Sequence, residues 1–201
     1  GRHVADEVWF RIVQIVTNNK ELQKYATMAL FESLLDPKAH ETCICMATYL
    51  VGEYGYLVMD EEGMFPDQQF EALKMHFGNA SKGTRGLILS AMAKMCNVYP
   101  DFREEIRQFM DKYRSSADVE LQQRAIEYAA LPGLGDEWLE EVLREMPQYS
   151  MDRVSPIEAR LQSEAEAKGE EPRERTASSN SASGTNGGHD SQGTLAMPPA
   201  A

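Results

Sequence analysis

The sequence has little positive charge. Of its 201 residues, 20 are lysine or arginine and 32 are aspartate or glutamate, so the formal net charge is −12. Phosphate backbones and anionic membrane surfaces both attract basic proteins. The charge balance therefore argues against a general nucleic-acid binder and against direct membrane attachment. Two basic pairs, 82 with 85 and 103 with 107, could form a small patch, but a solvated helix face is the more ordinary interpretation.

Cysteine is scarce, and long apolar runs are absent. Three cysteines, an odd number, in a chain without a recognisable signal peptide indicate a reducing compartment. No apolar run reaches the roughly 18 residues that a membrane-spanning helix needs. We therefore expect a cytoplasmic protein whose membrane association is indirect. A helical pattern starts within a few residues of Gly1, which suggests a fragment of something longer.

Residue patterns for a reacting centre are lacking too. His40, Cys43 and Cys45 resemble a metal site, but helical side chains two residues apart point about 200° apart, so the two cysteines could not share an ion. Cys96 has no local basic partner that would lower its pKa. There is no phosphate-binding glycine loop and no nucleophile elbow. We expect neither an enzyme nor a bound metal or cofactor.

What the sequence does contain is helical periodicity from end to end. Apolar residues recur at three- and four-residue spacing, and no alternating strand pattern competes, so the predicted fold class is all-α. Residues 20–35 give the clearest amphipathic pattern, with a stripe of Leu22, Tyr25, Ala26, Ala29, Leu30 and Leu34. The predicted helices cover residues 6–18, 20–35, 40–59, 66–77, 84–99, 101–113, 118–131 and 138–146.

Eight helices of this length, joined by short loops, are best described as four antiparallel pairs. Ile12, Leu50, Ile88 and Ile126 each come from the first helix of a pair and are spaced 38 residues apart. This period is close to that of HEAT and armadillo repeats, roughly 40–47 residues. We therefore predict an α-solenoid of stacked helix pairs over residues 1–149. A globular eight-helix bundle is the alternative.

The composition changes after about residue 150. Glu, Ala, Lys, Ser, Thr, Asn, Gly and Pro dominate from there to residue 201, and almost nothing apolar remains to bury. Such a segment cannot offset the entropy lost on ordering. We predict a disordered linker over residues 150–201.

The helix predicted at residues 118–131 has one apolar side and one polar side. Leu121, Ala125 and Tyr128 follow helical spacing on the first. The polar row consists of Glu120, Gln123, Arg124 and Glu127. Glu120 precedes Arg124 by four residues, the favourable order for a helical ion pair. The row is our candidate for a surface that contacts another subunit, and plain solvent exposure is the alternative.

Several stretches resemble the adaptins, the large chains of clathrin adaptor complexes. Residues 118–128 (DVELQQRAIEY) look like a segment shared by the alpha, gamma and related adaptins. Residues 7–16 (EVWFRIVQIV) and 49–55 (YLVGEYG) are similar to the alpha type of the plasma-membrane complex, and residues 145–161 to the point where its trunk gives way to a hinge. The resemblance covers about residues 6–161.

This resemblance implies the carboxy-terminal part of an adaptin trunk and the start of its hinge. Such a trunk is a helical scaffold that holds a second large chain, a medium subunit and a small subunit during clathrin-mediated endocytosis. Clathrin and accessory proteins would bind through other parts of the protein, and membrane phosphoinositide only indirectly. The alternatives are a gamma-type adaptin, a coatomer chain or a nuclear-transport chain, and more distantly an enzyme that uses Cys96 or the acidic loops.

Overall fold

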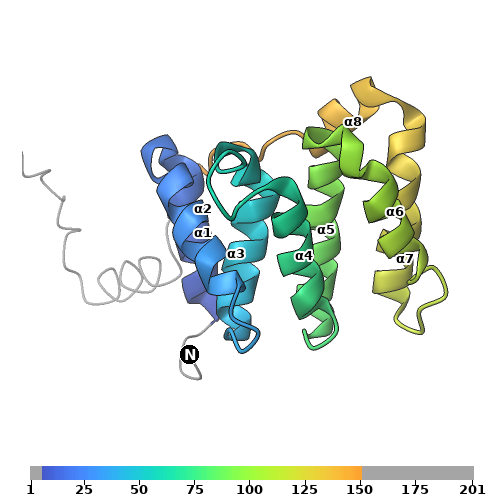
Figure 1. Ribbon diagram of the computed structural model, residues 1–201, viewed down its shortest axis with the longest axis horizontal. Helices are drawn as coiled ribbons and strands as arrows, with labels where there is room; N and C mark the ends of the chain where they lie inside the picture. The colour runs from blue at the N-terminus through green and yellow to red at the C-terminus, as the bar shows by residue number, and fades with distance from the viewer. Residues whose placement is uncertain (1–5, 151–201) are drawn as a thin grey trace, which may run out of the picture. The chain divides into compact units, whose positions relative to one another are not determined.

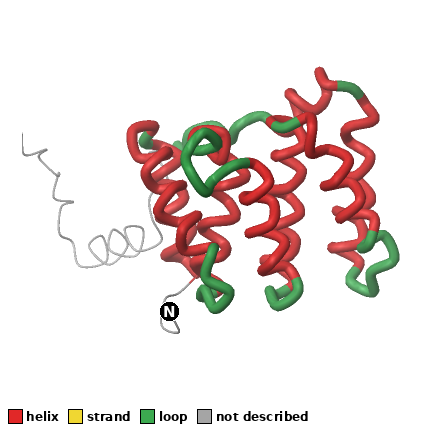
Figure 2. The backbone as a smooth tube through the Cα atoms, viewed as in Figure 1, coloured by secondary structure: helices red, strands yellow, loops and turns green. Residues whose placement is uncertain are grey.

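The computed structural model describes residues 6–150, which fold as helices joined by short loops (Figures 1 and 2). The predicted linker, 150–201, lies outside these residues except for Ser150, so that boundary stays a prediction. The α-helices are α1 (Asp6–Asn18), α2 (Lys20–Leu34), α3 (Glu41–Tyr54), α4 (Pro66–Phe77), α5 (Lys82–Val98), α6 (Arg103–Asp111), α7 (Val119–Ala130) and α8 (Asp136–Leu143). Short 3-10 turns follow α3, precede α6 and follow α7, at Gly55–Leu57, Pro100–Phe102 and Leu131–Leu134.

The odd-numbered helices form a row in which α1 packs against α3, α3 against α5, and α5 against α7. Each of α2, α4 and α6 lies against both its own pair partner and the next odd-numbered helix. Figure 1 shows these helices side by side along the described residues. Antiparallel pairs that stack in sequence order make a helical solenoid, so the predicted fold class is confirmed.

The last helix breaks this order. After α7, the chain turns through Gly135, whose φ of 106° lies in a region that favours glycine. The turn sends α8 back against α5, where Leu139 is fully buried. Trp138, Val142 and Met146 follow helical spacing in the predicted helix at 138–146, but all three are exposed. Helix α8 ends at Leu143 and is covered on one side only.

Local signals account for the starts of α3, α4, α5 and α7. Asp118 caps α7, accepting hydrogen bonds from the backbone N–H groups of Glu120 and Leu121. Pro66 occupies the first turn of α4, as predicted. Helix α5 starts earlier than expected, because the hydroxyl of Ser81 caps it by accepting from Thr84 N–H. Thr84, where the predicted helix begins, instead lies inside α5.

Two glycines allow close approach of neighbouring elements. A Cβ placed on Gly52 would lie 2.9 Å from Cα of Ala91, so only glycine fits where α3 meets α5. A Cβ on Gly55 would lie 2.4 Å from the side-chain oxygen of Gln69. Gln69 is itself buried and donates to the carbonyls of Gly55 and Met64, which fixes the turn after α3.

Helix α2 buries a different face from the one predicted. Its buried residues are Gln23, Thr27, Phe31 and Leu34. Leu22 and Tyr25 of the predicted stripe are exposed, Tyr25 by 73%. The polar members of the buried face are tolerated because they are bonded: the hydroxyl of Thr27 donates to the carbonyl of Gln23 at 2.7 Å. The two apolar members, Phe31 and Leu34, join the main core.

Helix α1 also differs from expectation. Val13 and Val16 are buried, whereas Val8, Ile12 and Ile15 are exposed. The apolar residues Val8, Ile12, Ile15 and Val16, which follow helical spacing in the sequence, therefore lie on two faces of the helix. Val16 packs with Leu50 and Tyr54 of α3 in a small apolar cluster, separate from the main core. Ile88 of α5 corresponds to Ile12, two repeats later in the chain. Unlike Ile12, it is fully buried, because α5 has neighbouring helices on both sides.

Candidate functional site

The four residues of the polar row predicted on α7 lie on one side of the helix. Three of them face solvent, and Arg124 also contacts α5. Glu120, Gln123 and Glu127 are exposed, and the amide of Gln123 donates to the carboxylate of Glu127 at 2.8 Å. The predicted ion pair is present: Arg124 Nε lies 2.7 Å from Glu120 Oε1. Ion pairs of this kind at an exposed surface contribute little to stability. The three exposed side chains are therefore available to a partner.

Arg124 differs from the rest of the row because it also reaches α5. One of its terminal nitrogens donates to the hydroxyl of Ser90 at 2.8 Å and to that of Tyr128 at 3.4 Å. Its aliphatic stem crosses Gly86, where a Cβ would lie 3.4 Å from Nε. Arg124 thus joins α7 to α5, a role that helical spacing within α7 could not reveal.

Residues 144–150, which we call the strap, form the most extensive polar contact between distant parts of the chain. They follow α8 without helical structure and run back over the ends of α5, α3 and α1, as the orange trace in Figure 1 shows. Four side chains at those helix ends hold them, and we call this set the helix-end track: Asn18, Glu53, Tyr56 and Lys94.

The centre of the helix-end track is an ion pair between Glu53 of α3 and Lys94 of α5. The side chain of Glu53 is 4% exposed and that of Lys94 is 18% exposed. Each also bonds the strap: Lys94 Nζ donates to the carbonyl of Arg144 at 3.2 Å, and Met146 N–H donates to Glu53 Oε2 at 3.0 Å. Buried charges require such additional partners.

Three of the four basic residues named from the sequence pair with acids, and the fourth, Arg85, donates to the carbonyl of Gly78 at 2.7 Å. Lys82 lies 3.1 Å from Asp118, Arg103 lies 2.7 Å from Asp136, and Arg107 bonds Glu104 and Asp111 on its own helix. Hydrogen bonds from Arg107 and then Gln108 lower the pKa of Glu104 to about 2. These pairings favour the solvated-face interpretation over a basic patch.

The cysteines show no arrangement for catalysis. Burial raises the pKa of the Cys96 thiol to about 12, with Arg103 opposing the shift only partly. A thiol of that pKa is protonated at neutral pH and is a poor nucleophile. Cys45 lies beside the Thr84 hydroxyl at 3.3 Å. Among residues 6–150, no group of three or more His, Cys, Asp or Glu side chains could hold a metal ion.

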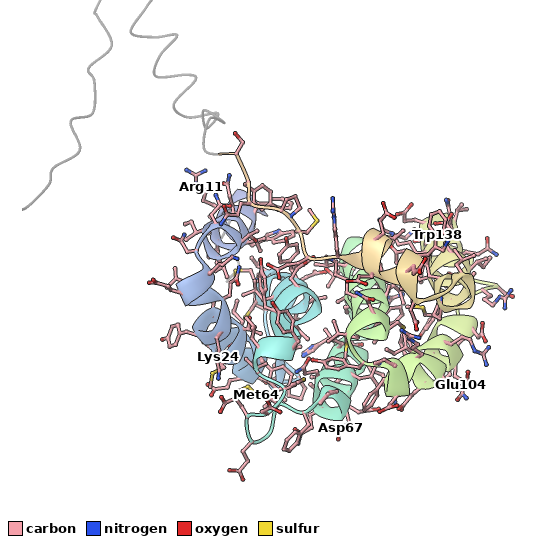
Figure 3. All side chains as sticks on the ribbon, turned by 90° about the horizontal axis from the view of Figure 1, so that it is seen from above. Arg11, Lys24, Met64, Asp67, Glu104 and Trp138 are labelled. Atoms are coloured by element: carbon pink, nitrogen blue, oxygen red, sulfur yellow. The ribbon has the colours of Figure 1, made fainter. Side chains whose placement is uncertain are left out.

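A shallow pocket opens beside α8, lined by Asn97, Pro100, Arg103, Asp136 and Glu140. Two of its three charged lining residues, Arg103 and Asp136, bond each other. On the outer side of α8, Trp138 stands at the edge of the molecule (Figure 3) and is 60% exposed. Neither feature brings together an acid, a base and a nucleophile. In the described part of the chain, no helix is long and apolar enough to cross a membrane.

The chain is similar to known adaptins. A family model described as the adaptin N-terminal region matches residues 1–136. The chain is 36% identical over 149 residues to AP-2 complex subunit alpha-2 of Dictyostelium discoideum, covering 74% of this chain and 15% of that protein. It is also 36% identical over 161 residues to AP-2 complex subunit alpha-1 of Arabidopsis thaliana, covering 78% and 16%.

A gamma-type relative matches less of the chain. AP-1 complex subunit gamma-1 of Arabidopsis thaliana is 31% identical over 144 residues, covering 65% of this chain and 16% of that protein. The chain thus spans about a sixth of the length of these relatives. The matching model describes the amino-terminal region of adaptins, so it does not support the expectation that this chain is the carboxy-terminal part of the trunk.

The family model covers well over half of the chain and takes in α1 to α7 completely. The paired helices of the structure and the resemblance of residues 118–128 point to the same conclusion. The chain belongs to the adaptin family.

Proposed function

We propose that this chain is a non-catalytic scaffold segment of a clathrin adaptor large subunit, of the alpha type that acts in endocytosis at the plasma membrane. The observation that carries the proposal is the match of residues 1–136 to the adaptin N-terminal region, with alpha subunits of AP-2 complexes among the relatives. The stacked helices support it, since solenoids offer extended surfaces to other proteins.

The proposed partners are a second large adaptin chain, a medium subunit and a small subunit. The protein would work on the cytoplasmic side of clathrin-coated pits, with clathrin, accessory proteins and phosphoinositide bound through other parts of the complex. The net charge of −12 supports protein partners rather than nucleic acid. The burial of Cys96, whose thiol is protonated at neutral pH, supports a role in which this cysteine is not a nucleophile.

Within this scaffold we assign the contact surface to the polar row on α7: Glu120, Gln123, Arg124 and Glu127. The exposure of Glu120, Gln123 and Glu127 supports the assignment. Arg124 would take part mainly by fixing Glu120, because its guanidinium also bonds Ser90. Charged and polar rows of this kind set partner choice and association rate more than affinity.

Co-purification of the full-length protein tests the assembly. A tagged full-length chain is purified from its own cells, and the proteins recovered in stoichiometric amounts are identified by mass spectrometry. The proposal predicts a second large adaptin-type chain, a medium subunit and a small subunit. Recovery of coatomer or nuclear-transport subunits instead would contradict it.

Charge reversal tests the contact surface in the same purification. Gln123→Lys with Glu127→Lys should reduce recovery of one partner at least about tenfold, since like charges placed across an interface cost several kcal/mol. The matched control is Gln108→Lys with Glu104→Lys, which changes the same residue types at the same four-residue spacing on the exposed face of α6, where the two side chains are also joined by a hydrogen bond. Equal recovery from both double variants would remove α7 as the contact surface.

A further inference from the structure

The helix-end track holds the strap chiefly by its backbone. Lys94 Nζ donates to the carbonyl of Arg144, and Glu53 Oε2 accepts from the N–H of Met146. Asn18 contacts both backbone groups of Tyr149. Contacts to the backbone recognise an extended chain and depend little on which side chains it carries.

Asn18 makes the most specific of these contacts. Its Oδ1 accepts from the N–H of Tyr149 at 2.7 Å, and its Nδ2 donates to the carbonyl of the same residue at 3.0 Å. A side-chain amide carries one acceptor and one donor group, so it can satisfy both backbone groups of one extended residue. The carbonyl of Asn18 also accepts from the amide of Gln148, at 3.5 Å. The end of α1 therefore binds the strap as it would bind a peptide.

Two strap side chains add selectivity. The hydroxyl of Tyr56 donates to Glu145 Oε2 at 3.1 Å, which calls for a carboxylate at that position. Burial, and then this bond to Glu145, raise the pKa of Tyr56. Tyr149 is half-buried, and it is the one residue of the strap that is not exposed. The track therefore favours a carboxylate followed, four residues later, by an aromatic side chain.

The strap itself is weakly covered. Residues 144–148 are all exposed, and of the strap only Tyr149 is half-buried. The track, by contrast, is built into the fold, since its Glu53–Lys94 pair is buried between α3 and α5. Polar groups already held in place by the fold lose little conformational freedom when they bind another extended segment in place of this one.

We propose that the helix-end track is a docking site for an extended peptide of a partner protein, and that the strap is its built-in, displaceable occupant. The partner peptide carries Glu or Asp four residues before Tyr, Phe or Trp. Its backbone takes the contacts of Arg144, Met146 and Tyr149 with Lys94, Glu53 and Asn18. Docking of the partner frees the strap.

The test uses the 201-residue chain with its strap expelled by Met146→Pro and Tyr149→Pro. Proline has no backbone N–H, so the two substitutions delete the bonds to Glu53 and Asn18 while leaving the track intact. Release is measured by trypsin cleavage after Arg144, because Lys94 holds the carbonyl of the bond to be cut. A fluorescent peptide that copies residues 144–150 is then titrated against each chain, and circular dichroism checks the helix content.

The variant with both proline substitutions, called the expelled chain, should be cleaved after Arg144 at least ten times faster than the wild type. It should also bind the peptide at least ten times more tightly than the wild type does. Adding Asn18→Ala to the expelled chain should abolish binding, and a peptide with Glu145→Gln and Tyr149→Ala should bind at least ten times more weakly. Unchanged cleavage would show that these N–H contacts do not hold the strap. Binding no better than to the wild type, or binding that survives Asn18→Ala, would likewise overturn the proposal.

Discussion

Glu53 of α3 and Lys94 of α5 form the most buried ion pair in residues 6–150. The pair joins neighbouring repeats near the carboxy-terminal ends of α3 and α5, and each member also bonds the strap that returns from α8. One contact thus ties together α3, α5 and residues far along the chain. Removing either charge would leave the other buried without its partner.

Replacing Lys94 with methionine should therefore destabilise the fold by about 3 kcal/mol, since breaking a buried pair by removing one partner is strongly destabilising. Lys74→Met is the matched control, because Lys74 pairs with Glu71 on the exposed face of α4. Its cost should stay below about 1 kcal/mol. Urea unfolding followed by circular dichroism measures both. Equal costs would mean that the Glu53–Lys94 pair does not stabilise the joint between repeats.

Gly52→Ala should push α3 and α5 apart. The added Cβ would lie 2.9 Å from the backbone Cα of Ala91, which cannot move aside as a flexible side chain could. The expected cost is about 1–3 kcal/mol, as for other overpacked positions. Gly78→Ala, at the end of α4 with nothing within 4 Å of its Cβ, should be neutral or slightly stabilising. A neutral Gly52→Ala, measured by the midpoint of thermal unfolding, would show that the two helices are loosely packed.

Arg124→Met should destabilise the joint between α5 and α7. Methionine keeps much of the aliphatic stem over Gly86 but loses the bonds to Ser90 and Tyr128, at a cost of about 1–2 kcal/mol. The control is Arg114→Met, which removes an arginine that is more than half exposed and pairs with Asp111. Its effect should stay within about 1 kcal/mol. If urea unfolding gives the same midpoint for both variants, Arg124 is a surface residue and nothing more.

Cys96 should resist alkylation in the folded protein. With a pKa of about 12, only roughly one thiol in ten thousand is ionised at pH 8, and burial also blocks access. Cys43 and Cys45 are half-buried and serve as internal controls. Mass spectrometry after iodoacetamide treatment should find Cys96 modified at least about tenfold more slowly than either, until urea unfolds the chain. Preferential labelling of Cys96 in the native state would revive the enzyme hypothesis that was set aside.

Helical periodicity predicted the helices well because each depends on local signals. Residues 6–18 form a helix as predicted, and the end of α2 and the start of α7 each lie within one residue of expectation. Which face each helix buries was harder to predict. Tyr25 and Ile12 fit apolar stripes but are exposed, because burial depends on the neighbouring helices rather than on the helix itself.

The strap was missed for a different reason. Tyr149 bonds Asn18 across 131 positions, and Met146 bonds Glu53 across 93. These contacts use backbone groups, which leave no pattern in the sequence. Arg124 was placed correctly on α7 from its spacing to Glu120, but its bond to Ser90 of α5 depends on tertiary packing. Whether the row on α7 contacts another subunit stays a prediction.

The proposal that these stacked helices hold other adaptor subunits can be tested with a cryo-electron microscopy map of the complex purified through the full-length chain. In that map, α1 to α7 should form the same row of paired helices, with the polar row of α7 against another subunit. A map in which residues 6–150 contact no other subunit would contradict it.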